Sequence, residues 1–389
     1  MSSQSSHGFA TRAIHAGQEP DSATGAIIIP IYATSTFVQE RPGVHKGYEY
    51  SRSGNPTRSA LESCIAQLEE GVAGFAFASG LAAESVIIDT LPKGSHIIAT
   101  DDLYGGTFRL FDKVKRELQD LEITYVDMTD ESAVVRAIRS NTRLIWVETP
   151  TNPLLKIIDL EKIAAIATEH RLISVCDNTF ASTYLQRPLT LGFDLVVHSA
   201  TKYLNGHSDI VAGLIVARQD DAVTQRIRFL QNAIGSVLSP FDSFLLLRGL
   251  KTLTVRMEAH CANALAIALH LEAHSKVRQV LYPGLPASPY HGVATRQMKG
   301  YGGMVSFYLH GGAEETQRFL REIRLFALAE SLGGVESLIE VPALMTHASI
   351  PAEIREQLGI SDTLIRLSVG IEELDDLLHD LDQALAKLN

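Results

Sequence analysis

The sequence predicts an α/β protein whose larger domain is built on a mainly parallel β-sheet. Two observations predict this class. Between residues 74 and 217, short apolar runs rich in strand-forming residues alternate with longer stretches of helical spacing, as is typical of sheets in which crossover helices join parallel strands. The chain is also long enough, at 389 residues of which 46% are hydrophobic, to bury a large core and to form about two or three domains.

Several short apolar runs are predicted to form the strands of this sheet, because each is bounded by polar or turn-forming residues. Segments 110–121 and 160–169 lie between runs and repeat apolar residues at helical spacing, so we expect helices there. The predicted strands are 74–78, 96–99, 123–126, 144–147, 172–175, 195–197 and 210–212.

The segments that flank the predicted sheet have different patterns. Residues 25–56 are rich in turn formers and are expected to form an irregular arm. A long helix-compatible stretch at 247–273 is followed by mixed elements near 304–309 and 364–371, which predicts a second domain. The expected division is an N-terminal arm at 1–53, a larger ligand-binding domain at 54–243 and a C-terminal domain at 244–389.

The composition indicates which partners to expect. A formal net charge of −11 without a Lys/Arg run disfavours nucleic acid and anionic membranes, because binding a polyphosphate needs a basic patch. Residues 1–16 are polar and do not resemble a secretory signal, and no window is long and apolar enough to span a bilayer. Cys64, Cys176 and Cys261 are widely separated, which suggests neither a disulfide framework nor a metal site. We expect a cytoplasmic protein that acts on small molecules.

Ligands bind at the carboxyl ends of parallel strands, so the residues after each run are the candidates for a site. Ser79, Gly80 and Leu81 follow the first run and open a helix whose free N–H groups could hold a phosphate, although an ordinary serine cap accounts for the same residues. Tyr104 follows the second run in a glycine turn, where its ring could stack on a planar group; a loop tyrosine packed for area is the alternative.

Three later runs also end in polar residues. Asn152, in a turn stiffened by prolines, could donate to a phenolate oxygen. Asp177 could pair with a protonated ring nitrogen, although an aspartate at this position is more often a helix cap. Ser199, Thr201 and Lys202 offer two hydroxyls and an amine in one turn, and a lysine gains meaning only from such company because most lysines lie on the solvated surface.

Together these turns supply a phosphate cradle, a stacking ring, an oxygen donor, a partner for a pyridinium nitrogen and an amine. This is the set that a pyridoxal 5′-phosphate (PLP) site requires. The amine of Lys202 would hold the cofactor's aldehyde and move protons, while Asp177 would keep the ring nitrogen protonated so that the ring accepts electrons. The sequence therefore predicts a PLP-dependent enzyme.

Two motifs resemble the Cys/Met-metabolism family of PLP-dependent enzymes, in which the chain is most similar to the cystathionine γ-lyases and γ-synthases of trans-sulfuration. Segment 199–209, SATKYLNGHSD, is similar to the lysine motif of this family, and segment 48–57, YEYSRSGNPT, is similar to its N-terminal motif. The resemblance covers nearly the whole chain. It implies the type I PLP fold, with a smaller α+β C-terminal domain, and a homotetramer made of two catalytic dimers.

The resemblance also implies roles around the cofactor. Lys202 would hold it, Asp177 would pair with the ring nitrogen, and Tyr104 would stack on the ring and take part in catalysis. Tyr50 and Arg52 would reach across a dimer to the cofactor phosphate of the partner subunit. The remaining expected cofactor contacts are Ser79, Gly80, Leu81, Asn152, Thr179, Ser199 and Thr201.

Other residues are implied to bind the substrate. Arg366 matches the arginine that holds the substrate carboxylate, with Asn152 and Ser331 beside it. A guanidinium suits this task because it binds both carboxylate oxygens at once. The residues that resemble the polar set of γ-lyases, which recognises the distal amino-acid end of cystathionine, are Glu49, Arg109 and Glu330.

The resemblance leaves several reactions open. Gly106 stands where methionine γ-lyases of the family typically carry cysteine, which disfavours that reaction. Leu332 stands where one group of cystathionine β-lyases carries tryptophan, which disfavours that group. The sequence of segment 345–349, MTHAS, is similar to the corresponding segment of lyases in the family. We expect γ-elimination of L-cystathionine to L-cysteine, 2-oxobutanoate and ammonia. The alternatives are a γ-synthase that joins cysteine to an O-acylhomoserine, a methionine γ-lyase, and a PLP-binding protein without catalysis.

Overall fold

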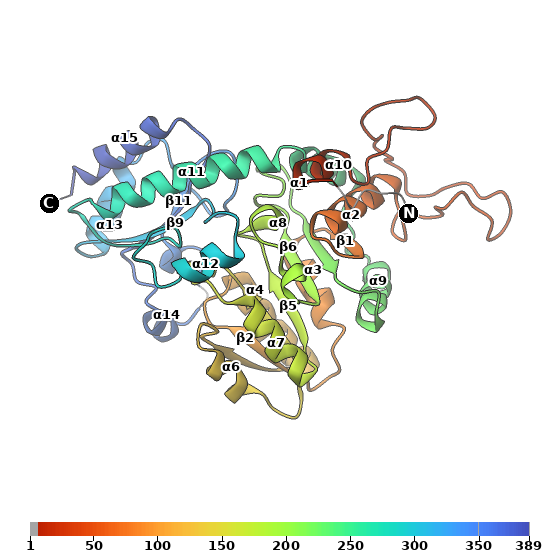
Figure 1. Ribbon diagram of the computed structural model, residues 1–389, viewed down its shortest axis with the longest axis horizontal. Helices are drawn as coiled ribbons and strands as arrows, with labels where there is room; N and C mark the ends of the chain where they lie inside the picture. The colour runs from red at the N-terminus through yellow and green to blue at the C-terminus, as the bar shows by residue number, and fades with distance from the viewer. Residues whose placement is uncertain (1–6, 349, 389) are drawn as a thin grey trace.

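The computed structural model describes residues 7–348 and 350–388, so residues 1–6 of the expected arm and Ser349 of the lyase-like segment lie outside it. It contains a large sheet of seven strands and a small sheet of five strands (Figure 1). The strands of the large sheet are β1 (Ala73–Phe77), β2 (His96–Thr100), β3 (Glu122–Val126), β4 (Thr142–Glu148), β5 (Ile173–Asp177), β6 (Leu195–Ser199) and β7 (Gly213–Ala217). Those of the small sheet are β8 (Val277–Leu281), β9 (Met304–Leu309), β10 (Ala327–Leu328), β11 (Leu338–Glu340) and β12 (Leu364–Ser368).

The large sheet is mainly parallel, as predicted. Its strand order is β1-β7-β6-β5-β4-β2-β3. The run from β6 through β5, β4 and β2 to β3 pairs in parallel, and β7 is antiparallel to both of its neighbours. The carboxyl ends of β4, β5 and β6 therefore meet at one edge of the sheet, where the candidate residues were expected.

Helices cover both faces of the large sheet. One face packs against α3 and α9, and the other packs against α2 and α7. The helices that precede the second half of the chain are α1 (Phe9–His15), α2 (Pro56–Leu68), α3 (Gly80–Ile88), α4 (Gly105–Leu110), α5 (Arg116–Gln119), α6 (Glu131–Ala137), α7 (Leu160–His170), α8 (Ser182–Leu185) and α9 (Ala222–Ile234). The later helices are α10 (Pro240–Leu250), α11 (Leu253–Glu272), α12 (His291–Gln297), α13 (Ala313–Glu322), α14 (Ala352–Leu358) and α15 (Leu374–Leu385).

Strand alternation decides which side chains face α3. Trp146 and Val175 belong to the apolar cluster on the α3 face, whereas Val147 and Cys176 belong to the cluster beneath α7. Because side chains alternate along a strand, the last residue of β4 and the last residue of β5 point to the same face as Trp146 and Val175. These two residues are both acidic, so two carboxyl groups are buried on the α3 face.

The last predicted strand of the large sheet was placed too early. Segment 210–212 is not part of a strand, and β7 begins at Gly213. Contacts with the turn after β6 replace strand pairing here, because the hydroxyl of Thr201 accepts the N–H of Ala212 at 3.0 Å and lies 3.3 Å from its carbonyl. Val211 is 60% exposed, which does not suit a central strand.

Two of the predicted helices are interrupted. Segment 110–121 contains the end of α4, a turn of π-helix at Phe111–Lys115, and α5. Segment 247–273 contains the end of α10 and all of α11, which are separated at Thr252. Just before this break α10 approaches another segment closely, because a Cβ on Gly249 would lie 2.3 Å from the carbonyl oxygen of Asn205.

The N-terminal segment forms an arm. In Figure 1 it extends away from the two sheets as irregular loops, as the turn formers at 25–56 predicted. Its regular pairing is confined to isolated bridges such as Thr36 with Tyr50. The expected domain boundary after residue 243 falls within α10, and the division into domains remains a prediction. Within the described residues, no helix is both long and apolar enough to cross a membrane.

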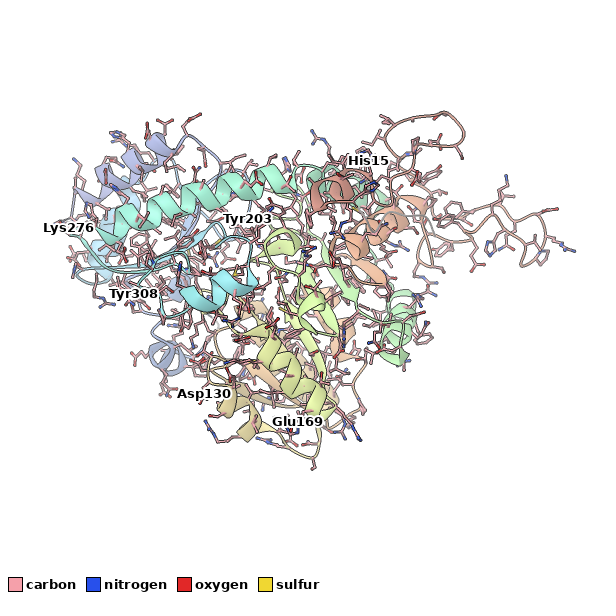
Figure 2. All side chains as sticks on the ribbon, viewed as in Figure 1. His15, Asp130, Glu169, Tyr203, Lys276 and Tyr308 are labelled. Carbon is pink, nitrogen blue, oxygen red and sulfur yellow. The ribbon has the colours of Figure 1, made fainter. Side chains whose placement is uncertain are left out.

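The turn after Lys202 is held by α11. The ring of Tyr203, labelled in Figure 2, is buried and packs edge to face on His260 of α11 at 5.1 Å. Arg256, one helical turn before His260, is 4% exposed and donates to the carbonyl of Tyr203 at 2.7 Å. A Cβ on Gly206 would lie 2.0 Å from the guanidinium of Arg256, so this position requires glycine. Helix α11 thus fixes the turn that carries Lys202.

Replacing Arg256 with methionine is expected to destabilise the protein. The substitution leaves the buried carbonyl groups of Tyr203 and Leu204 without the guanidinium that donates to them. Because each lost bond to a charged donor costs roughly 1.5–3 kcal/mol, we expect a loss of about 2–4 kcal/mol in the free energy of unfolding. Denaturant titration measures it, with R256K as the matched control that keeps one donor. Equal stability of R256M and the wild type would contradict this role of α11.

Candidate active site

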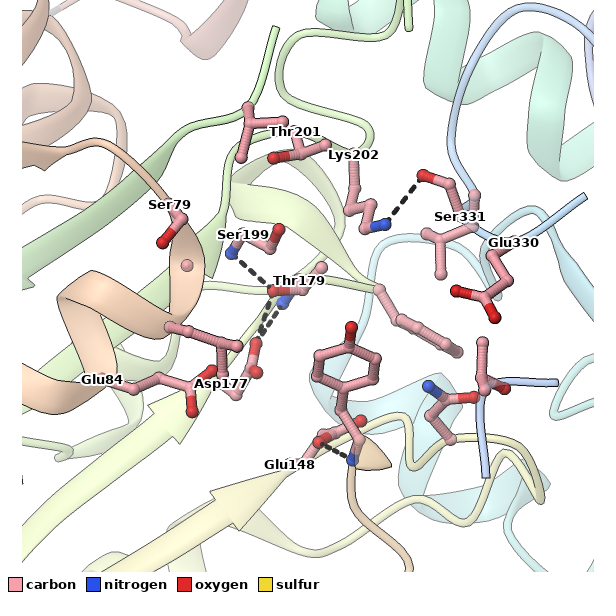
Figure 3. A pocket seen from close by; sticks show the side chains of 18 of the residues that line it. Ser79, Glu84, Glu148, Asp177, Thr179, Ser199, Thr201, Lys202, Glu330 and Ser331 are labelled. Carbon is pink, nitrogen blue, oxygen red and sulfur yellow. Dashed lines mark hydrogen bonds between the residues drawn. The ribbon is translucent and has the colours of Figure 1, made fainter. Parts of the chain in front are cut away.

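A cavity of about 290 Å³ lies at the carboxyl ends of the parallel strands (Figure 3). Side chains from the large sheet, from the helix after β1 and from segments next to the small sheet line it together. The predicted residues that line it are Ser79, Gly80, Leu81, Tyr104, Asn152, Asp177, Thr179, Ser199, Thr201, Lys202, Glu330, Ser331 and Arg366. Most of the residues expected from scattered parts of the sequence therefore meet in one place.

The N-terminus of α3 forms one wall of the cavity. The hydroxyl of Ser79 accepts the N–H of Ala82 at 3.1 Å and so caps the helix. A Cβ on Gly80 would lie 3.0 Å from the Cβ of Ser199, and one on Gly213 would lie 2.0 Å from the carbonyl oxygen of Ser79. Both glycines let this turn approach the sheet closely. The first N–H groups of a helix have no partner within it, so this wall can hold an anion.

Asp177 is fixed by its own turn. Its Oδ1 accepts the N–H of Thr179 at 3.0 Å and the hydroxyl of Thr179 at 2.5 Å. The Thr179 oxygen in turn accepts the N–H of Ser199 at 2.8 Å, which joins the ends of β5 and β6. Burial raises the pKa of Asp177, and the Thr179 bonds oppose this rise. A cation placed beside Asp177 would favour its charged form.

Lys202 projects from the turn after β6 toward the small sheet. Its Nζ donates to the Ser331 hydroxyl at 2.8 Å. Burial lowers the pKa of Lys202 to about 8, and the positive charge of Arg366 adds to the effect. Ser331 has φ +94°, a left-handed conformation that costs a non-glycine residue roughly 1–3 kcal/mol and that often occurs at functional sites. At a pKa of about 8, about a tenth of Lys202 is uncharged and nucleophilic at neutral pH, far more than for an ordinary lysine.

Arg366 lies in the middle of β12 and is only 2% exposed. It donates to Oδ1 of Asn152 at 2.8 Å and to the carbonyl of Ser331 at 3.0 Å, and it lies 3.0 Å from Oε1 of Glu340. Its Nε has no partner among the described residues. The guanidinium thus retains a free donor at the cavity.

Tyr104 begins α4 and is 37% exposed at the cavity. Its N–H donates to Oε2 of Glu148 at 2.8 Å, so the carboxyl at the end of β4 fixes the backbone that carries the ring. Burial raises the pKa of the Tyr104 hydroxyl, and Arg109 opposes this rise. In the ligand-free protein the hydroxyl therefore keeps its proton at neutral pH.

Four predicted residues do not line the cavity of their own chain. Tyr50 and Arg52 lie together on the arm, where Arg52 donates to the carbonyl of Asn232 at 2.7 Å and its guanidinium lies 5.5 Å from the Tyr50 ring centre. Glu49 is exposed on the same arm, and Arg109 is exposed on α4. Their expected roles remain predictions.

The sequence reasoning missed several acidic and polar residues around the cavity. Glu84 on α3 and Glu148 on β4 both line it, and Glu340 pairs with Arg366. His347 helps to hold the loop that carries Asn152, because its Nε2 lies 2.9 Å from the carbonyl of Asn152. Glu148 could have been found because it directly ends a predicted strand. Glu84 gave no such signal, because a glutamate in a helix usually faces solvent.

The lining suits PLP by the chemistry of its donors. A helix N-terminus at a glycine turn suits a phosphate, the Asp177 carboxylate suits a protonated ring nitrogen, and the Lys202 amine suits an aldehyde. The cavity volume is also appropriate for a small cofactor and substrate. The residues present therefore fit this cofactor.

Comparison with known proteins agrees with the geometry. The model of the family described as Cys/Met metabolism PLP-dependent enzyme matches residues 10–386. A cystathionine β-lyase from Coxiella burnetii is 57% identical over 375 residues, which cover 96% of this chain and 97% of that protein. A cystathionine γ-lyase from Dictyostelium discoideum is 54% identical over 388 residues, covering 100% of both. The crystal structure of cystathionine γ-lyase from Lactobacillus plantarum complexed with L-serine has a TM-score of 0.95 at 50% identity, and the match covers 98% of this chain and 99% of that one.

The rate at which the cofactor-free protein captures PLP should depend on the protonation of Lys202. The rate should rise with pH through a midpoint near about pH 8 and level off above it, because only the uncharged amine attacks the aldehyde. Replacing Arg366 with leucine removes a positive charge that lowers the pKa of Lys202, so the midpoint should move to higher pH. Stopped-flow absorption measures both profiles.

A matched control for this experiment is Arg321→Leu, which removes an exposed arginine from α13. Its midpoint should equal that of the wild type. An unchanged midpoint in R366L would show that Arg366 does not set the charge of Lys202.

Proposed function

The chain belongs to the Cys/Met metabolism PLP-dependent enzyme family, and we propose that it catalyses γ-elimination of L-cystathionine to L-cysteine, 2-oxobutanoate and ammonia. It is a PLP-dependent lyase, because the family uses this cofactor and the relatives are named lyases. The choice of γ-elimination rests on the γ-lyase relatives that match over the full length and on the residues that face the cavity.

One observation carries the proposal. Lys202 and Arg366 both contact Ser331, the amine at its hydroxyl and the guanidinium at its carbonyl. A basic amine and a carboxylate-binding group thus face one small cavity. An α-amino acid whose carboxylate binds Arg366 would place its Cα near Lys202, as proton removal at Cα requires.

The residues would hold the cofactor in the following way. The α3 turn at Gly80 and Leu81, with Ser199 and Thr201, would bind its phosphate. Asp177 would pair with its ring nitrogen, and Tyr104 would stack on the ring. When bound at Lys202, PLP supplies an electron sink for the charge left by proton removal.

The chain's own groups would then move the protons. The released Lys202 amine would take the proton from Cα and later a proton from Cβ, with Tyr104 assisting. Lys202 or Tyr104 would protonate the sulfur so that cysteine leaves from Cγ. Asn152 and Arg366 would hold the substrate carboxylate throughout.

The distal amino-acid end of cystathionine is proposed to meet a separate polar set. Glu330 lines the cavity and is exposed to solvent, so it can pair with a substrate ammonium group. Arg109 lies on α4 near Tyr104 and could receive the distal carboxylate. Glu49 lies on the arm and would act in a neighbouring site.

We also propose that the cavity is completed by a second copy of the chain in a homotetramer. Tyr50 and Arg52 on the arm do not line the cavity of their own chain, and Val211 at the cavity is 60% exposed. Arg52 would bind the cofactor phosphate of the partner subunit, for which a guanidinium is well suited.

A second candidate is β-elimination of cystathionine to homocysteine, pyruvate and ammonia. It is favoured by the 57% identity to the Coxiella burnetii cystathionine β-lyase and by the 54% identity to that of Lactococcus lactis. The two reactions share the Cα proton removal, so the residues above serve both. They differ in whether the bond at Cγ or the bond at Cβ of the substrate is broken.

The products of L-cystathionine decide between the candidates. The wild type should release 2-oxobutanoate and cysteine, and Lys202→Ala should lose at least about a thousandfold in turnover because it lacks the base that removes the proton. Chromatography of derivatised oxoacids measures both products. Pyruvate with homocysteine would instead support β-elimination, and consumption of O-succinylhomoserine with cysteine in place of cystathionine cleavage would support the synthase.

Complementation between two inactive variants tests the shared site. R52A and K202A should each be nearly inactive alone. In a mixed dimer, the R52A subunit keeps Lys202 and receives an intact Arg52 from its partner, so one site is complete. Co-assembly should therefore restore about a quarter of the wild-type activity. Failure to restore activity in dimers shown to be mixed would mean that Arg52 serves its own chain.

A further inference from the structure

Three carboxyl groups meet on the α3 side of the cavity. Glu148 and Asp177 are register partners at the ends of β4 and β5, and Glu84 comes from α3, which covers this face. Glu84 and Glu148 are each 4% exposed and Asp177 is 7% exposed. All three line the cavity, and Figure 3 shows Glu84 beside Asp177. If all three carboxyl groups were ionised, their buried negative charges would repel one another strongly.

Two of the three have evident partners. Asp177 accepts two hydrogen bonds from Thr179, and Glu148 accepts the N–H of Tyr104. Glu84 differs, because its Oε2 is buried and has no hydrogen-bond partner in the described part of the chain. None of the ion pairs between described residues includes Glu84. The mechanism proposed above does not use it either.

The surroundings of Glu84 disfavour its charged form. Burial raises its pKa well above the usual value, the charge of Asp177 raises it further, and Thr107 on α4 opposes the rise. The other titratable groups that face it are Glu148 on β4 and Tyr104 next to α4, and a charged Glu84 would raise the pKa of both. Asp177 is better able to remain charged than Glu84, because the Thr179 bonds stabilise its carboxylate.

We propose that Glu84 is kept as an uncharged acid beside Asp177, so that the cavity presents one carboxylate fewer to an anionic cofactor. Glu84 is one helical turn from Gly80 on α3, on the same face as the phosphate-binding turn. An ionised Glu84 would repel the phosphate of the cofactor. The protonation state of Glu84 therefore sets how tightly the cavity binds the cofactor. The inference rests on PLP binding in this cavity and does not depend on which carbon–sulfur bond is cleaved.

The charge of Glu84 is linked to cofactor affinity. If a bound anion raises the pKa of Glu84 by one unit, the affinity falls tenfold across its ionisation. In Glu84→Gln, which has nearly the same shape but no proton to lose, this fall should be absent. The two proteins should therefore bind the anion equally where Glu84 is protonated and should diverge at higher pH.

The test uses pyridoxine 5′-phosphate, which lacks the aldehyde and so removes the reaction with Lys202 from the titration. Its dissociation constant is measured from neutral to alkaline pH with full-length, cofactor-free wild type and E84Q. The ratio of the wild-type constant to the E84Q constant should be near one at neutral pH and should rise about tenfold at alkaline pH. The infrared difference spectrum, wild type minus E84Q at neutral pH, should show the protonated-carboxyl band of Glu84; the raised pKa of Glu148 leaves a similar band in both proteins, which the difference removes.

The matched control is Glu62→Gln on α2, a glutamate that accepts the N–H of Ala76 at 2.9 Å and does not line the cavity. E62Q should keep the pH profile of the wild type, and E84M provides a second neutral variant if E84Q is unstable. A flat ratio, or a difference spectrum without a protonated-carboxyl band, overturns the proposal while leaving the cofactor assignment intact. A wild type that binds neither this probe nor PLP would overturn the cofactor assignment as well.

Discussion

The buried guanidinium of Arg366 is the interaction on which the geometry of the cavity depends. It is held by Asn152 from the loop after β4, by Glu340 from β11 and by the backbone of Ser331. Removing one partner of a buried ion pair typically costs about 3–5 kcal/mol, so these segments are constrained to stay together. Arg366 therefore fixes the small sheet against the carboxyl edge of the large one, and it does so at the point where Ser331 meets Lys202.

Burial and the charge of Arg366 also set the protonation of Lys202, a group that would act on a substrate. Lys202 is buried near Arg366 and has a pKa lowered to about 8, while Asp177 and its acidic neighbours lie on the α3 side. The Lys202 amine and the Asp177 carboxyl thus lie at different sides of one small cavity (Figure 3). That separation suits a cofactor with an anionic phosphate, a cationic ring nitrogen and an aldehyde, and it suits an amino-acid substrate with a carboxylate.

The sequence was most informative where the signal was local. Asp177 is the last residue of β5 and Lys202 lies three residues after the end of β6, so the rule that ligands bind at strand ends pointed to both positions. The prediction of a strand at segment 210–212 was wrong, because the N–H of Ala212 donates a hydrogen bond to the Thr201 hydroxyl in place of strand pairing. Glu84 and Glu340 were missed because their burial depends on packing that a helical or apolar pattern does not encode. Tyr50 and Arg52 gain no role from a single chain, since neither lines the cavity of its own chain.

The most direct test of the account is to identify the amine that carries the cofactor. The purified protein, loaded with PLP, is treated with borohydride, which makes the link between cofactor and amine permanent. It is then digested, and the pyridoxyl-modified peptide is sequenced by mass spectrometry. The account predicts a single modified residue, Lys202, in the peptide that contains SATKYLNGHSD. A protein that binds no PLP, or one modified mainly at another lysine, would contradict it.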